Sequence, residues 1–164
     1  MKAERGCAEK RFCRWESPIG TLAVAEDGSG ISDLFLCRQD MPHGFPEATT
    51  PLLREAVRQL GEYFSGKRKE FSLPLSLHGT PFQLDDWKAL QAIPYGETRS
   101  YRQIAEQIGC PKGFRAVGMA NHENPVMIVV PCHRVVAADG SLGGYACGLG
   151  AKRFLLDLER TRAG

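Results

Sequence analysis

The chain has 164 residues, which allows one domain or two small ones with a hydrophobic core of ordinary size. Its composition, 43% hydrophobic and 24% charged, is typical of a globular protein, and it has no apolar run long enough to span a membrane. The net charge of +2 is too small to indicate a polyanionic partner by itself, and no apolar stretch follows the first charged residues, so we expect no secretory signal and a cytoplasmic protein.

Six cysteines are spread along the chain, namely Cys7, Cys13, Cys37, Cys110, Cys132 and Cys147. No two have the CxxC spacing of a structural zinc site. Without a secretory signal, we expect free thiols rather than disulfides. The alternative is a metal site formed by Cys7, Cys13, Cys37 and His43. We expect neither a metal nor another cofactor.

The first half of the chain predicts a small antiparallel sheet with one helix. Short apolar segments are separated by turn residues, and Asp27–Gly30 is a hairpin signal. Thr50 is a helix cap with Pro51 at the first helical position, and apolar residues then recur on one face until Gly66. The strands are expected at residues 12–15, 21–25, 31–36 and 71–77.

The second half predicts mainly helices. Thr80–Gln83 and Ser100–Gln103 each have the pattern of a capping box, which satisfies backbone groups in the first turn of a helix. Two short helices joined by residues 109–113 have the size of a helix-turn-helix. Within residues 99–115, Glu106 is the only acidic residue among several basic ones, which fits a modest phosphate-binding face. The helices are expected at residues 81–94, 101–108, 114–122 and 151–159, and the domains at residues 1–79 and 80–164.

The segment PCHRVV, Pro131–Val136, places a cysteine beside a histidine after an apolar run, residues 126–130, that we predict to be a buried strand. In one flat strand Cys132 and His133 would point to opposite faces, but Pro131 does not belong inside a central strand. We therefore predict a turn there that brings the thiol and the imidazole together. An imidazole that takes a thiol proton needs an orienting acceptor, for which the candidates are Glu159, Asp157 and Asp139.

The motifs around PCHRVV form an ordered set. IPYGETRSYRQIA precedes it, Asn124–Pro125 lies a short distance before it, and GGY…GL…K…LL…E follows it. Across residues 81–159 this set resembles the methylated-DNA–protein-cysteine methyltransferases, the O6-alkylguanine-DNA alkyltransferases; the first half is similar mainly through Ser17–Gly20. The resemblance implies an α/β (α+β) fold, with a ribonuclease-H-like N-terminal domain and a mostly helical winged helix-turn-helix domain that carries the active cysteine.

The resemblance implies that Cys132 takes an alkyl group, typically methyl, from O6 of guanine in double-stranded DNA, with O4-alkylthymine as a further candidate. His133 would accept the thiol proton, directly or through a water, and Glu159 would orient the imidazole. Asn124 would hold the turn by side-chain hydrogen bonds. Because a thioether is a poor leaving group, each protein, expected to be a monomer, would act once and be consumed.

The resemblance also implies contacts with DNA whose target nucleotide is flipped out of the helix. Arg115 would fill the gap left in the base stack, and Tyr101 would turn the phosphate and donate a proton to guanine N3. Small side chains would allow close approach to the minor groove. The residues implied to bind DNA are Arg115, Tyr101, Ala116 and Gly118, and those implied to line the guanine pocket are Tyr101, Val135 and Tyr145.

Some residues depart from the family's pattern. His122 and Glu123 stand where a glycine or a basic residue is usual, and Met119 is bulkier than the usual residue. Cys147 replaces a glycine, and we expect it to narrow the pocket against bulky adducts such as benzyl. The alternatives are a DNA-binding module without chemistry, a cysteine hydrolase, which would need an oxyanion hole, and a regulatory protein.

Overall fold

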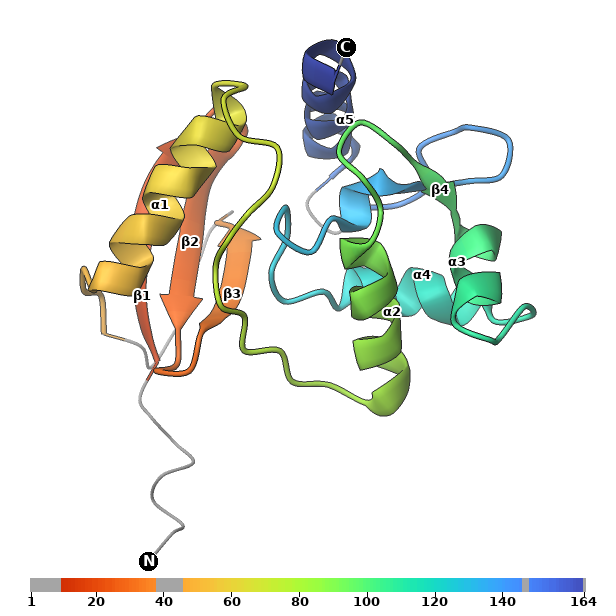
Figure 1. Cartoon of the computed structure of the whole chain (residues 1–164), viewed down its shortest axis with the longest axis horizontal. Helices are drawn as coiled ribbons and strands as arrows, with labels where there is room; N and C mark the ends of the chain where they lie inside the picture. Colours follow the sequence, from red (N-terminus) through yellow and green to blue (C-terminus); the bar gives the residue numbers. More distant parts are fainter. Residues whose placement is uncertain (1–9, 38–45, 146–147, 164) are drawn as a thin grey trace, which may run out of the picture. The chain divides into compact units, whose positions relative to one another are not determined.

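The computed structural model describes residues 10–37, 46–145 and 148–163. The chain divides into two compact units, Met1–Leu77 and His78–Gly164, each of which is described by itself (Figure 1). Within the described ranges, no helix combines the length and the apolar character that a membrane crossing requires.

The first unit is built on a three-stranded antiparallel sheet in the order β1 (Arg11–Ser17), β2 (Gly20–Glu26), β3 (Ile31–Leu36). The three strands and the hairpin expected from the sequence are thus confirmed. The turn between β1 and β2 is tight because Gly20 adopts a φ of 123°, which favours glycine. The central strand β2 buries four consecutive side chains, so both of its faces are covered.

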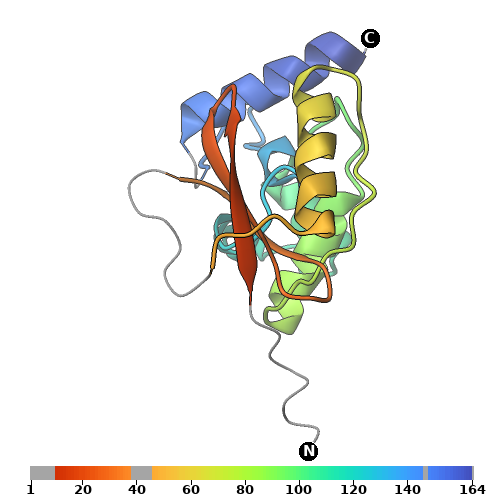
Figure 2. The same ribbon diagram turned by 90° about the vertical axis from the view of Figure 1, so that its left-hand side faces the viewer.

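Helix α1 (Pro51–Phe64) packs against β1 and β2 and covers one face of the sheet (Figure 2). It begins as predicted, with the side chain of Thr50 accepting a hydrogen bond from the backbone of Leu53. Its buried face contains Leu53, Leu60 and Tyr63, each worth roughly 1.5–3 kcal/mol on burial.

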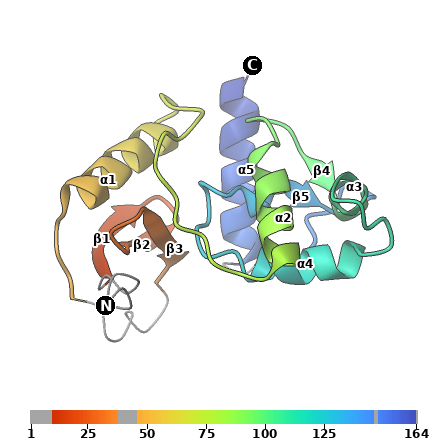
Figure 3. The same cartoon turned by 60° about the horizontal axis from the view of Figure 1, so that its bottom comes forward.

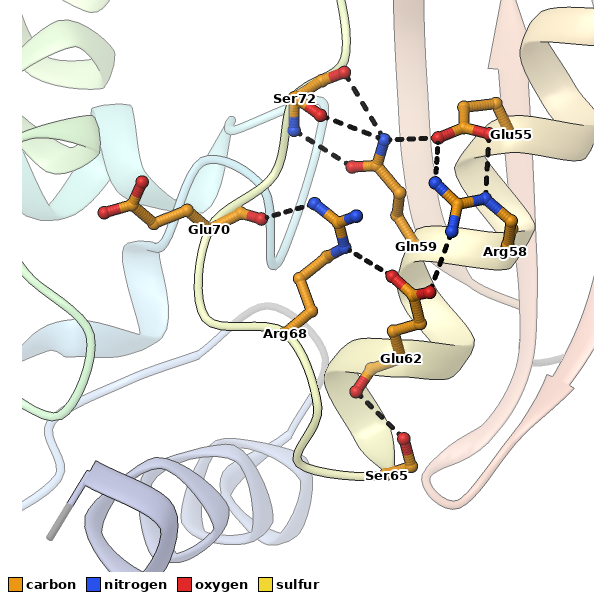
Figure 4. Close-up of polar contacts among 8 residues, drawn as sticks. All are labelled: Glu55, Arg58, Gln59, Glu62, Ser65, Arg68, Glu70 and Ser72. Atoms are coloured by element: carbon orange, nitrogen blue, oxygen red, sulfur yellow. Dashed lines mark hydrogen bonds and ion pairs between the residues drawn. The ribbon is translucent and has the colours of Figure 1, made fainter.

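The strand predicted at residues 71–77 is wrong, because the structure has extended chain there with a single bridge between Leu75 and Ile31. The side chains do alternate in burial, but Pro74 has no N–H and cannot continue a ladder. Instead, the buried side chain of Gln59 on α1 bonds both backbone groups of Ser72 (Figure 4). The Gln59 amide thus forms with Ser72 the hydrogen bonds that a neighbouring strand would otherwise form.

The second unit contains helices α2 (Pro81–Gln91), α3 (Tyr101–Gln107), α4 (Phe114–His122) and α5 (Leu149–Ala163), and a two-stranded parallel sheet of β4 (Arg99–Ser100) and β5 (Val135–Val136). Both capping boxes are present as predicted. Helix α4 packs against α2 and α3 (Figure 3), and the indole N–H of Trp87 on α2 donates to the carbonyl of Ala120 at 2.9 Å. Helix α2 ends three residues before Pro94, which disfavours helical backbone in the residue before it.

The buried strand predicted at residues 126–130 is also wrong. The segment forms turns, with the backbone of Val130 bonded to Val126 and that of Val129 bonded to Met127. Ile128 has a φ of 73°, a conformation that costs a β-branched residue energy. Burial in this segment is nearly complete, so the apolar run reflects a buried turn, which periodicity alone does not distinguish from a buried strand.

Candidate active site

Cys132 and His133 lie in a short 3-10 helix, η2 (Cys132–Arg134), which places the turn where the sequence predicts it. Pro131 leads into it, and its carbonyl accepts a hydrogen bond from the backbone of Arg134 at 3.0 Å. A 3-10 turn rotates successive side chains by about a third of a circle, so neighbouring residues need not point to opposite faces as in a strand. All three side chains of η2 are buried.

Asn124 holds the buried turn and touches the sulfur. Its side-chain nitrogen donates to the carbonyl of Val130 at 2.7 Å and to Sγ of Cys132 at 3.2 Å. Its side-chain oxygen accepts from the backbone of Val126 at 3.0 Å. One amide therefore connects both ends of the segment that carries the cysteine.

The imidazole of His133 is held by a buried carboxylate on α5. Nε2 of His133 and Oε2 of Glu159 are 2.7 Å apart, and both side chains are essentially inaccessible to solvent. Arg134 binds the same carboxylate through two nitrogens at 2.7 and 3.0 Å, and it also donates to the carbonyl of Ile93 at 2.6 Å. Of the three acceptors considered from the sequence, Glu159 is therefore the one that reaches His133.

Burial and the hydrogen bonds among Glu159, His133 and Arg134 determine the charges in this group. Burial alone would raise the pKa of Glu159, but hydrogen bonds from His133 and Arg134 outweigh it and lower that pKa to about 2. Burial lowers the pKa of His133 despite the bond to Glu159, so the imidazole is neutral at pH 7. With a permanent cation on the carboxylate, the neutral ring donates Nε2–H to Glu159 and keeps Nδ1 as an acceptor. Nδ1 is buried and has no hydrogen-bond partner among the described residues.

Lys152, on α5, is the lysine of the motif GGY…GL…K…LL…E, but the sequence analysis gave it no role. Its fully buried ammonium group donates to the carbonyls of Val135 at 2.6 Å, Gly144 at 3.0 Å and Leu142. Burial lowers its pKa to about 8, and attraction to Cys132 opposes that shift. The available signal was spacing, because Lys152 and Glu159 are seven residues apart and therefore share one face of a helix.

A cavity of about 210 Å³ opens beside Cys132. This exceeds the roughly 150 Å³ that accommodates benzene, so the cavity can hold one small planar group. Its lining comes from α3, α4, η2 and the glycine-rich loop before α5, and consists of Tyr101, Gly118, Asn121, His122, Cys132, Gly144 and Tyr145. Asn121 and His122 were not expected there, whereas the expected Val135 is fully buried in β5 and is not part of the lining.

The side chain of Tyr101 is packed against the glycine-rich loop. The backbone of Gly144 hydrogen bonds its hydroxyl group, although burial is the larger influence and raises the pKa of Tyr101. A Cβ atom at Gly143 would lie 2.8 Å from that hydroxyl oxygen, and Gly143 has a φ of 70°. Glycine is therefore required at this position on two grounds.

The residues expected to bind DNA lie on α4 and its surroundings. Arg115 and Ala116 are exposed, and Gly118 is partly exposed and forms part of the cavity wall. The guanidinium carbons of Arg102 and Arg115 lie 5.6 and 6.0 Å from the ring centroid of Phe114. Two cations thus flank one exposed aromatic ring at the start of α4.

The four described cysteines, Cys13, Cys37, Cys110 and Cys132, are not in disulfide bonds. Cys7 and His43, which entered the alternative metal site, lie outside the described residues, as does Cys147. Within residues 10–37, 46–145 and 148–163, no three histidine, cysteine or acidic side chains are grouped closely enough to hold a metal ion.

Comparison with known proteins matches both halves of the chain. Residues 12–77 match the ribonuclease-like domain of 6-O-methylguanine DNA methyltransferase, and residues 81–161 match its DNA-binding domain. The methylated-DNA–protein-cysteine methyltransferase of Methanosarcina barkeri is 51% identical over 150 residues, covering 89% of this chain and 94% of the relative. The constitutive enzyme of that name in Bacillus subtilis is 49% identical over 152 residues, covering 88% and 92%.

Solved structures support the same family assignment as the related sequences. The crystal structure of the Mycobacterium tuberculosis O6-methylguanine methyltransferase has a TM-score of 0.88 at 46% identity, covering 94% of this chain and 95% of that one. The M. tuberculosis OGT in complex with DNA has a TM-score of 0.87 at 48% identity, covering 93% and 94%. The expected fold class is confirmed by these matches. With both family domains present in order and about half of its residues shared with relatives along most of their length, this chain belongs to the methylated-DNA–protein-cysteine methyltransferase family.

Proposed function

We propose that the chain repairs double-stranded DNA containing O6-alkylguanine by a single transfer of the alkyl group to Sγ of Cys132. The observation that carries this proposal is the position of Cys132, which lines the cavity while the next residue, His133, is bonded to a buried carboxylate. An exposed thiol such as that of Cys110 has no such surroundings among the described residues. Family membership supports the reaction, and the geometry supports Cys132 as the acceptor.

The thiol of Cys132 must lose its proton before it can attack. His133 is the base, because Nε2–H is committed to Glu159 and the buried Nδ1 remains as the proton acceptor, directly or through one water. The Asn124 amide donates to the sulfur at 3.2 Å and favours the thiolate. The buried ammonium group of Lys152 favours it electrostatically.

The transfer itself exchanges one bond for another. The sulfur of Cys132 attacks the saturated carbon attached to O6, a C–S bond forms, and the C–O bond breaks with its electrons going to guanine. Tyr101 lines the same cavity, and its hydroxyl would supply a proton at N3 as charge develops. Because nothing then removes the alkyl group from sulfur, the protein is consumed in one turnover.

Access to the base requires that α4 engages the duplex. Gly118 and Asn121 lie on the cavity wall, so the cavity opens on this helix, and the exposed Arg115 follows Phe114 at its start. Arg115 enters the base stack in place of the extruded nucleotide, while Ala116 and Gly118 let the helix approach the minor groove. The complex of the M. tuberculosis relative with DNA supports DNA as the partner.

We assign alkylguanine as the preferred lesion, with O4-alkylthymine as a secondary substrate, and a monomer as the acting species. The four described free thiols suit a reducing cytoplasm, where a single-use cysteine stays reactive. A cysteine hydrolase is the weaker alternative, because both domains of the chain match the methyltransferase family.

The proposed single turnover is tested by stoichiometry. Increasing amounts of protein are mixed with excess duplex carrying one O6-methylguanine, and restored guanine is counted after digestion of the DNA. We expect one guanine restored per protein, none with Cys132→Ala, and the wild-type yield with Cys110→Ala. Repeated turnover would contradict the proposal, and tight binding without restored guanine would indicate a DNA-binding module instead.

A further inference from the structure

We propose that Asp86 is a positioning residue for alkyl transfer, whose buried carboxyl group sets the orientation of the Asn121 side-chain amide in the wall of the Cys132 cavity. This role depends on the proposed function, because it concerns how the cavity is held while the alkyl group moves. It adds a residue on α2, away from the reacting atoms, to the groups that shape the site.

Asp86 is fully buried at the contact between α2 and α4. Its neighbour Trp87 donates its indole N–H to the carbonyl of Ala120, and Asp86 meets the next residue of α4, Asn121 (Figure 3 shows the two helices in contact). Asn121 is itself 8% exposed and lines the cavity together with Cys132. A change at Asp86 can therefore reach the cavity through a single side chain, that of Asn121.

The Asn121 amide distinguishes the two protonation states of Asp86. With its nitrogen toward Asp86, it donates to Oδ2 at 2.6 Å and to the carbonyl of Val117 at 3.2 Å, and both ends of the amide are satisfied. An ionised carboxylate only accepts hydrogen bonds, so it requires this orientation. A protonated carboxyl can donate to the amide oxygen and so tolerates the reverse one.

Asp86 can change its charge near neutral pH. Burial raises its pKa to about 7. Burial is the only cause of the shift, so no charged neighbour contributes to it. The titratable or permanently charged side chains on α3, α4 and η2, the elements in closest contact with α2, are Tyr101, Arg102, Glu106, Arg115, His122, Cys132, His133 and Arg134.

The ionised state is the one that fixes the wall. It holds Asn121 in the orientation where each amide atom has a partner, whereas protonation lets the amide reverse and leaves its nitrogen facing donors. Alkyl transfer should accordingly be faster above the pKa of Asp86 than below it. A buried carboxylate without a counter-ion lowers the stability of the fold. The ionised Asp86 therefore orders the cavity wall but destabilises the folded protein.

The test compares rate constants for methyl transfer from duplex O6-methylguanine to Cys132 between about pH 6 and about pH 8.5 in wild type, Asp86→Asn and Asp86→Val. Asp86→Val removes the partner, and we expect transfer about fivefold slower or more at the higher pH, with DNA affinity within about twofold and an undiminished melting temperature. Asp86→Asn can accept from Asn121 at every pH, so we expect it to keep most of the rate and to lose part of the wild-type pH dependence.

A second variant separates positioning from folding. In an Asn121→Ala background, Asp86→Val should have no further effect on the rate, because the side chain through which Asp86 acts is gone. Identical pH profiles for wild type and Asp86→Asn, or an unchanged rate in folded Asp86→Val, would overturn the positioning role alone. A wild-type protein that transfers no methyl group at any pH would instead contradict the proposed function.

Discussion

At the scale of single residues, we expect transfer to depend on a neutral, correctly oriented His133. Burial lowers the pKa of this imidazole, so it is ready to accept a proton at pH 7. In His133→Gln, the new amide can still bond Glu159 but cannot take a thiol proton. We expect transfer to be slower by about 10²-fold or more, with unchanged DNA affinity, in single-turnover assays. A His133→Gln protein that reacts at the wild-type rate would remove this residue from the mechanism.

Lys152 links the site to the loop that borders it. Lys152→Met keeps the length of the side chain but leaves three carbonyls without their donor and removes the charge near Cys132. We expect transfer at least about tenfold slower, and about 2 kcal/mol lost from the free energy of unfolding in urea melts. The exposed Lys88 on α2 is the matched control, and Lys88→Met should change neither quantity.

The proposed reacting group, Cys132, could be identified from the sequence, while most of the side chains that surround it could not. Cys132 and His133 are adjacent, and the proline before them signals a turn. Arg134 and Lys152 lie in the quoted motifs but were given no role, because a charged residue is normally exposed. Whether such a residue is buried depends on partners from distant segments of the chain. Asn121 could not be predicted either, because its proposed role depends on Asp86. The polar pattern of the sequence assigns that carboxylate to the surface, whereas it is buried.

At the scale of elements, we expect α4 to be the helix that opens the duplex. Arg115→Ala should slow transfer from duplex DNA by about tenfold or more while leaving reaction with free O6-methylguanine unchanged, because the free base needs no flipping. Arg102→Ala is the control, since Arg102 lies against the same Phe114 ring. Equal losses on both substrates would show that Arg115 supports the fold rather than base flipping.

In the first unit, α1 holds the chain after it through one amide. Gln59→Ala should leave both backbone groups of Ser72 without partners and cost about 2 kcal/mol of stability, measured by urea unfolding. Arg58→Ala on the exposed side of the same network is the control, with an expected change of less than about 0.5 kcal/mol (Figure 4). A Gln59→Ala protein as stable as Arg58→Ala would contradict this account.

The starts of the three capped helices were predicted to the residue, because Thr50, Thr80 and Ser100 cap the first turn with their side chains. The two wrong strands, residues 71–77 and 126–130, lacked such local markers. In each, the apolar pattern correctly reported burial, but the partner of the backbone was a side chain or a turn rather than a strand. Periodicity reports which side chains are buried and not what the backbone bonds.

At the scale of the whole molecule, Asp86 should shape the dependence of stability on pH. Its pKa is raised from 3.8 to about 7, so its contribution to stability is fully present below about pH 4 and is lost as the pH rises through about 7. Asp86→Asn, which never ionises, should exceed wild type by on the order of 2 kcal/mol at about pH 8.5 and show no such gain near pH 4, measured by urea unfolding. A gain that is equal at both pH values would contradict a titrating Asp86.

The central claim is that Cys132 receives the alkyl group. It is tested most directly by incubating the protein with duplex DNA that carries one O6-methylguanine, digesting the protein and measuring peptide masses. The account predicts one added methyl group on the peptide containing Cys132, with guanine restored in the DNA and every other cysteine peptide unchanged. A methyl group on another residue, or restored guanine with no methyl group on the protein, would contradict it.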